Sequence, residues 1–79
     1  MSFTTVRDAL QAAWELKAIK SEAMWKQCAE KLDQAERQPA GRNATLAALM
    51  QEIKSESGKT IHPQVAEILL NDVRKLLHQ

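Results

Sequence analysis

The chain has 79 residues, of which 11 are lysine or arginine and 10 are aspartate or glutamate, so its formal net charge is only +1. Because these charges are balanced and interspersed, they argue against a nonspecific nucleic-acid binder and against an acidic mimic of DNA. The single cysteine excludes a disulfide within the chain and is typical of a reducing compartment, which predicts a cytoplasmic protein.

The length predicts one domain, residues 1–79, with a small core. No apolar run approaches the about 20 residues of a membrane span, and the start MSFTTVRDAL lacks the basic and apolar regions of a signal peptide. The available metal ligands, Cys28, His62 and His78, do not have the local spacing of a structural zinc site. We therefore expect a soluble protein without a metal or a cofactor.

Turn-forming residues gather at only two places, 38–43 and 57–60, and the segments around them are rich in Ala, Leu, Glu, Lys and Gln. No strand-like alternation of β-branched residues interrupts these segments. The sequence therefore predicts an all-α fold, a small bundle of three helices in which the first helix is long.

The predicted first helix begins at Thr4 or Thr5, because Thr5 and Asp8 have the spacing of a capping box. It meets no proline or glycine before Pro39, so it is expected to continue to about Arg37. A helix of that length spans roughly 50 Å.

The apolar face of this helix changes direction near Lys20 and Ser21, by roughly 100°, which exceeds the ~20° per heptad of an ordinary supercoil. One interpretation is a break near Ser21, which gives four helices. The other is a continuous or mildly bent helix that meets different partners along its length. The absence of Pro and Gly favours the continuous helix. Since neither shorter helix covers a helix of that length, this interpretation also predicts a homodimer.

The second predicted helix has Asn43 as its N-cap and ends near Ser57, with Gly58 at the next position, where glycine best accepts a left-handed backbone. The third begins at His62-Pro63, because proline is favoured at the first helical position, and continues to the chain end. Apolar residues cover roughly half the circumference of this last helix, so we expect it at the centre of the fold.

The segment Gly58-Lys59-Thr60 has the letters that end a phosphate-binding P-loop. That motif also needs a glycine five residues before Gly58, where this chain has Ile53, and a strand before the loop. A helix is predicted there instead. We therefore interpret Gly58-Lys59-Thr60 as a turn between helices.

Trp14 and Trp25 are the strongest candidates for a binding surface. Eleven residues apart on a continuous helix, they lie about 20° from each other, three turns apart on one side. Tryptophan is frequent at binding hot spots, and alanines near it allow another helix to approach. The alternative is that both indoles lie at the rim of the protein's own core or dimer interface. The protein-interface candidates are Trp14, Ala18, Met24, Trp25, Ala29 and Leu32.

A second hypothesis is a dimeric DNA-binding transcriptional regulator, because the last two helices and their short turn loosely resemble a helix-turn-helix. Its nucleic-acid candidates are Arg37, Arg42, Lys54 and Lys59. Against this hypothesis, the start of the last helix has no basic residue before Arg74, whereas phosphate and base contacts need them there.

No nucleophile–base pair, metal constellation or phosphate cradle is visible, so an enzyme is not expected. The sequence predicts a small protein-binding or regulatory module, such as an adaptor, an inhibitor or a chaperone. Its expected partner is a second copy of the chain, another protein, or both. Neither a membrane nor a small molecule is inferred.

Overall fold

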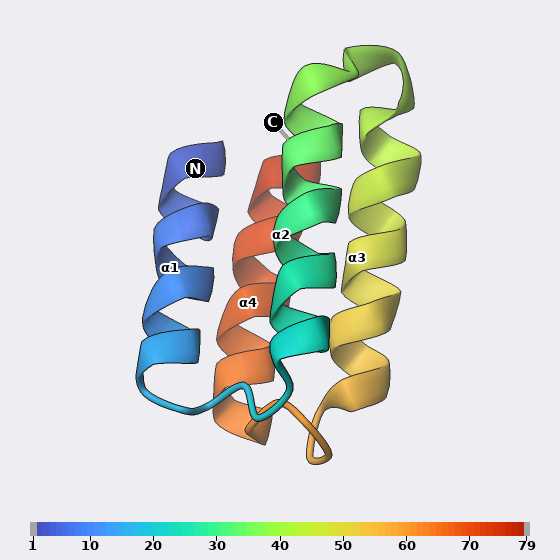
Figure 1. Cartoon of the computed structure of the whole chain (residues 1–79). Helices are drawn as coiled ribbons and strands as arrows, with labels where there is room; N and C mark the ends of the chain where they lie inside the picture. Colours follow the sequence, from blue (N-terminus) through green and yellow to red (C-terminus); the bar gives the residue numbers. More distant parts are fainter. Residues whose placement is uncertain (1, 79) are drawn as a thin grey trace.

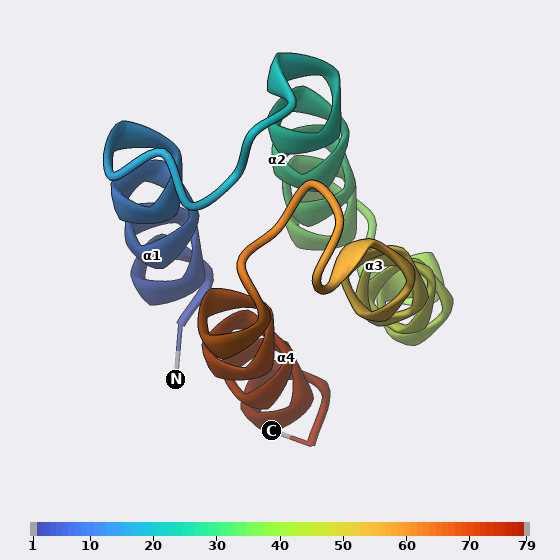
Figure 2. The same ribbon diagram turned by 90° about the horizontal axis from the view of Figure 1, so that it is seen from below.

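The computed structural model describes residues 2–78, and within them the chain forms four α-helices and one short 3-10 helix (Figure 1). The elements are α1 (Phe3–Glu15), α2 (Glu22–Arg37), η1 (Pro39–Gly41), α3 (Arg42–Glu56) and α4 (Pro63–Leu77). Successive α-helices run in opposite directions, and α1 packs against α4 to close the ring (Figure 2). The all-α bundle expected from the sequence is confirmed.

Two antiparallel helices, α1 and α2, take the place of one long first helix. α1 ends at Glu15, Lys17 adopts a left-handed backbone with a φ of 62°, and the Ser21 hydroxyl begins α2 by accepting a hydrogen bond from the Met24 N–H at 3.2 Å. The continuous helix that the absence of Pro and Gly favours is therefore wrong, and the alternative break near Ser21 is confirmed. The reversal directs both apolar faces into one core, which a straight helix with a rotated face does not do.

This reversal also removes the length argument for a second chain. The bundle measures 32 × 19 × 17 Å, and each helix is covered by two neighbours from the same chain. A homodimer stays a prediction, without the support of an uncovered 50 Å helix.

Local capping explains where the first and third helices begin. α1 starts earlier than predicted, because the Ser2 hydroxyl, not that of Thr5, caps it and accepts from the Thr5 N–H at 3.2 Å. α3 begins at Arg42, directly after η1, so Asn43 lies inside the helix and is not its N-cap. Both differences amount to about one or two residues, which is the length over which helix ends fray.

The core runs between the four helices and contains only apolar side chains and one thiol. α4 is not at its centre, because α4 contacts two neighbours just as α2 does, and its Ile68 is 56% exposed. None of the described helices is long and apolar enough to cross a membrane. The buried residues are Val6, Leu10, Ala13, Ile19, Cys28, Leu32, Ala35, Leu46, Leu49, Ile53, Ile61, Ala66, Leu69, Val73 and Leu76.

The connections 16–21 and 57–62 lie together at one end of the bundle, at the bottom of Figure 1. Two backbone hydrogen bonds join them. The Lys20 N–H donates to the Thr60 carbonyl at 2.6 Å, and the His62 N–H donates to the Ala18 carbonyl at 2.8 Å. We call these two joined connections the loop clasp.

Ile19 and Ile61 face each other in the loop clasp as an isolated antiparallel bridge, and they are only 1% and 0% exposed. Their side chains close the end of the core. Gly58 has a φ of 82°, so Gly58-Lys59-Thr60 forms the turn after α3 that the sequence predicts. The clasp thereby holds two segments that are far apart in the sequence in a defined relation.

Candidate protein-interaction site

Trp14 and Trp25 stack face to face at the end of the bundle that carries the loop clasp. Their ring centroids are 4.9 Å apart and their planes differ by 5°. On a continuous helix they would lie about 16 Å apart along the axis. The reversal between α1 and α2 replaces that line of indoles with a stacked pair, which we call the indole pair. Both rings are half-buried.

The indole pair lies between the two helices that carry it. The packing between α1 and α2 is less close than the packing between α2 and α3, and the wider spacing of α1 and α2 is visible in the end view (Figure 2). Further along the same seam, the Arg7 guanidinium donates to Asp33 and to Glu36 at 2.7 Å each. These hydrogen bonds and charges raise the pKa of Arg7, so it stays charged. The seam therefore has an ionic part and an aromatic part.

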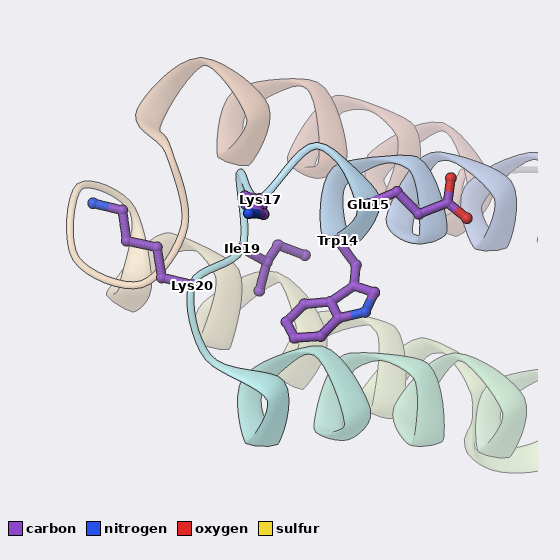
Figure 3. A pocket seen from close by; sticks show the side chains of 5 residues that line it. All are labelled: Trp14, Glu15, Lys17, Ile19 and Lys20. Atoms are coloured by element: carbon purple, nitrogen blue, oxygen red, sulfur yellow. The ribbon is translucent and has the colours of Figure 1, made fainter.

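A pocket of about 530 Å³ opens beside Trp14 at the start of the loop clasp (Figure 3). In that view Trp14 extends from α1 toward α2, Ile19 lies next to the indole, and the Glu15 carboxylate points away. Lys17 and Lys20 complete the lining, and both are exposed. We call this the indole pocket.

Of the other predicted interface residues, one is fully buried and three are half-buried. Leu32 is 0% exposed, so it belongs to the core and is not available to a partner. Ala29 is half-buried, and Met24 packs within α2, where its sulfur lies 3.7 Å from that of Cys28. Ala18 is half-buried in the loop clasp, where its carbonyl accepts from His62.

Sequence reasoning missed Lys17, Ile19 and Lys20 as pocket residues, because their position depends on a reversal that no proline or glycine marks. The rotation of the apolar face near Lys20 was the available signal. It indicates that the helix direction changes there, and therefore that the neighbouring residues line an end of the bundle.

The lysines of the loop clasp differ from the other charged groups around them. Lys17, Lys20 and Lys59 form no ion pair with any described residue. Lys26 and Lys31, by contrast, pair with Glu22 and Glu52 at 2.9 and 2.6 Å. The clasp lysines are therefore free to meet a partner's charge.

The carboxylates near the clasp already have partners. Glu15 accepts from the Gln11 amide at 3.1 Å, and Glu56 accepts from the Thr60 hydroxyl at 2.8 Å. Glu22 pairs with Lys26. Each of these three carboxylates therefore has a hydrogen-bond or ion-pair partner within the chain.

The four nucleic-acid candidates are not brought together. Arg37 and Arg42 flank η1, whereas Lys54 and Lys59 lie near the other end of α3. Twelve helical residues, or about 18 Å, separate Arg42 from Lys54. The Arg42 guanidinium also lies 5.1 Å from the centre of the Phe3 ring and donates to a backbone carbonyl.

Metal and thiol chemistry find no support in the described residues. No group of three potential metal ligands occurs among residues 2–78. Burial, with a smaller contribution from Glu52, raises the pKa of Cys28 to about 12, so its thiol is protonated and inert at neutral pH. His62 accepts from the Gln64 N–H at 3.2 Å and caps α4.

Fold and site together define a small four-helix bundle with an aromatic and basic pocket at one end. Comparisons with protein-family models, with curated proteins and with solved structures found no match.

Proposed function

We propose that this chain is a small non-enzymatic protein-binding or regulatory module and that the indole pocket is its binding site. The observation that carries the proposal is the stacked, half-buried indole pair beside an open pocket. Stacking contributes about 0.5–1.5 kcal/mol beyond the area it buries, so the rings are ordered before a partner arrives. Ordered aromatic side chains are frequent binding anchors, because little entropy is lost when a partner packs against them.

The character of the lining supports a protein as the partner. The half-buried Trp14 indole supplies apolar contact, and the exposed Lys17 and Lys20 supply polar contacts around it. An apolar centre with a polar rim is the usual anatomy of a protein–protein interface. No observation favours the alternative, a dimeric DNA-binding regulator, because its four basic candidates lie at both ends of the bundle.

The test is capture of a partner from extracts of the host with the tagged chain, with and without nuclease. Lys17→Glu/Lys20→Glu changes the pocket, and Arg74→Glu/Lys75→Glu makes the same change of charge at the other end of α4. Circular dichroism checks that each variant is folded. We expect a protein that survives nuclease, that the control retains and that the pocket variant loses. The proposal is wrong if no protein is captured, if nuclease removes it, or if both variants retain it equally.

A further inference from the structure

A second, smaller pocket of about 130 Å³ lies next to the indole pocket. Lys20 lines both pockets, and the second is completed by the turn after α3 and the start of α4. The loop clasp fixes the two pockets relative to each other, because its hydrogen bonds join Lys20 to Thr60 and Ala18 to His62. The two pockets meet at Lys20 and together form a depression at this end of the bundle.

The charge along this depression is mainly positive. Its lining contains three lysines and one carboxylate, that of Glu15, which points away from the pocket (Figure 3). Connections 16–21 and 57–62 contain Lys17, Lys20 and Lys59 and no aspartate or glutamate. None of the three lysines forms an ion pair with a described residue, whereas the neighbouring Glu15 and Glu56 are held by hydrogen bonds within the bundle. The depression thus combines an apolar end at Trp14 with three lysines that form no ion pair with a described residue.

We infer that this depression binds an extended acidic segment of a partner protein. A large apolar side chain of that segment packs against the Trp14 indole in the indole pocket, and its aspartates or glutamates lie against Lys20 and Lys59. The inference rests on the proposed function and names the chemistry of its partner. Charge complementarity of this kind speeds association and excludes basic segments, while the apolar anchor supplies most of the affinity.

An anionic membrane surface offers the same charge, but it fits the site less well. The indole pocket is recessed beside Trp14, and a flat layer of headgroups does not fill a recess. A side chain that projects from a peptide enters it. The peptide is therefore the occupant, and the membrane is an outcome that the experiment separates.

The experiment selects ligands for the full chain from a random library of phage-displayed peptides. The best sequences are then synthesised and titrated against three proteins: the wild type, Lys17→Gln/Lys20→Gln/Lys59→Gln, and Arg37→Gln/Arg74→Gln/Lys75→Gln as a control with equal charge loss. The control residues are exposed and lie in the C-terminal turns of α2 and α4. Indole fluorescence reports whether the ligand reaches the pocket, because both tryptophans belong to the indole pair.

We expect selected peptides in which Asp or Glu flanks one large apolar residue, and a change of indole fluorescence when they bind. The variant with all three clasp lysines replaced by glutamine should bind the peptides at least about tenfold more weakly than the wild type. The control variant should bind within about twofold of the wild type. Added salt should weaken binding, because it screens the charges. Peptides without acidic enrichment, equal loss in both variants, or no enrichment at all would overturn the inference. Binding to phosphatidylserine vesicles without binding to any peptide would overturn it as well.

The two proposals fail in different ways. If neutral peptides enter the pocket and the host partner is still lost with Lys17→Glu/Lys20→Glu, the acidic segment is wrong and the binding site stands. If acidic peptides bind but no host protein is captured, the chemistry of the pocket stands and the proposed function is wrong.

Discussion

The two connections of the loop clasp have nearly the same design, although their sequences predict very different structures. In both, the second residue after the helix has a left-handed backbone, Lys17 with a φ of 62° and Gly58 with a φ of 82°. Each contributes one buried isoleucine to the end of the core, and each ends in a residue whose side chain caps the next helix. Only the second connection contains a glycine, Gly58, and is followed directly by a proline, Pro63, and these two residue types mark a turn.

The comparison shows that burial decides the chain reversal at 16–21. A left-handed backbone at a residue other than glycine costs roughly 1–2 kcal/mol, and fully burying one isoleucine contributes roughly 1.5–3 kcal/mol. The contribution of Ile19 is therefore large enough to offset the cost at Lys17. Glycine makes such a turn easier, but it is not needed where the following residue enters the core.

The largest expected effect comes from the two isoleucines. Ile19→Ala and Ile61→Ala should each destabilise the fold by about 2–4 kcal/mol, because each removes a buried side chain and leaves a cavity. Urea denaturation of both variants measures this. Leu16→Ala is the matched control, since Leu16 is 79% exposed, and it should change the free energy of unfolding by less than about 0.5 kcal/mol. If Ile19→Ala destabilised the fold only slightly and Ile61→Ala destabilised it strongly, the two connections would not contribute equally to stability.

The left-handed residues should respond with opposite signs. Gly58→Ala should destabilise by about 1 kcal/mol, and Lys17→Gly should stabilise by about 0.5 kcal/mol, because glycine accepts this backbone without strain. The cost at Gly58 is conformational, since an added Cβ would meet only Pro63 at 3.9 Å. Thermal and urea unfolding measure both, with Lys20→Gly as a destabilising control. The same sign for both variants would contradict a shared left-handed geometry.

The indole pair should couple the first connection to the pocket. In a double-mutant cycle of Trp14→Leu and Trp25→Leu, the two changes should be non-additive by about 0.5–1.5 kcal/mol, which is the usual value for stacked aromatic rings. Urea denaturation of the two single variants and the double variant measures the coupling energy. Additive effects would show that the rings do not stack in solution and would remove the basis of the proposed site.

The smallest expected difference is between the two N-caps. Ser21→Ala should destabilise by about 1 kcal/mol, because its hydroxyl accepts from the Met24 N–H. His62→Ala should cost less, because histidine is not among the favoured N-cap residues and Pro63 already favours the start of α4. Unfolding of both variants at one pH gives the comparison, and Ser21→Thr, which keeps a hydroxyl, should restore most of the loss.

The sequence predicts the second half of this fold well and the first half poorly. The turn at Gly58, the start of α4 at Pro63 and the helical character of every segment follow from local preferences. The reversal at Lys17 does not, because it depends on the burial of Ile19 against Ile61, a contact between residues far apart in the chain. The candidate site could not be predicted from the sequence for the same reason. The tryptophans stand out by residue type, but their stacking and the lysines beside them arise only once the chain reverses.

Site-specific photo-crosslinking in the host tests the proposed function most directly. A photoreactive residue at position 17, in the indole pocket, is compared with the same residue at position 74, near the far end of α4. We expect one protein partner, resistant to nuclease, that crosslinks at position 17 and not at position 74. A partner that crosslinks equally at both positions, or only at position 74, would show that the indole pocket is not where this protein binds.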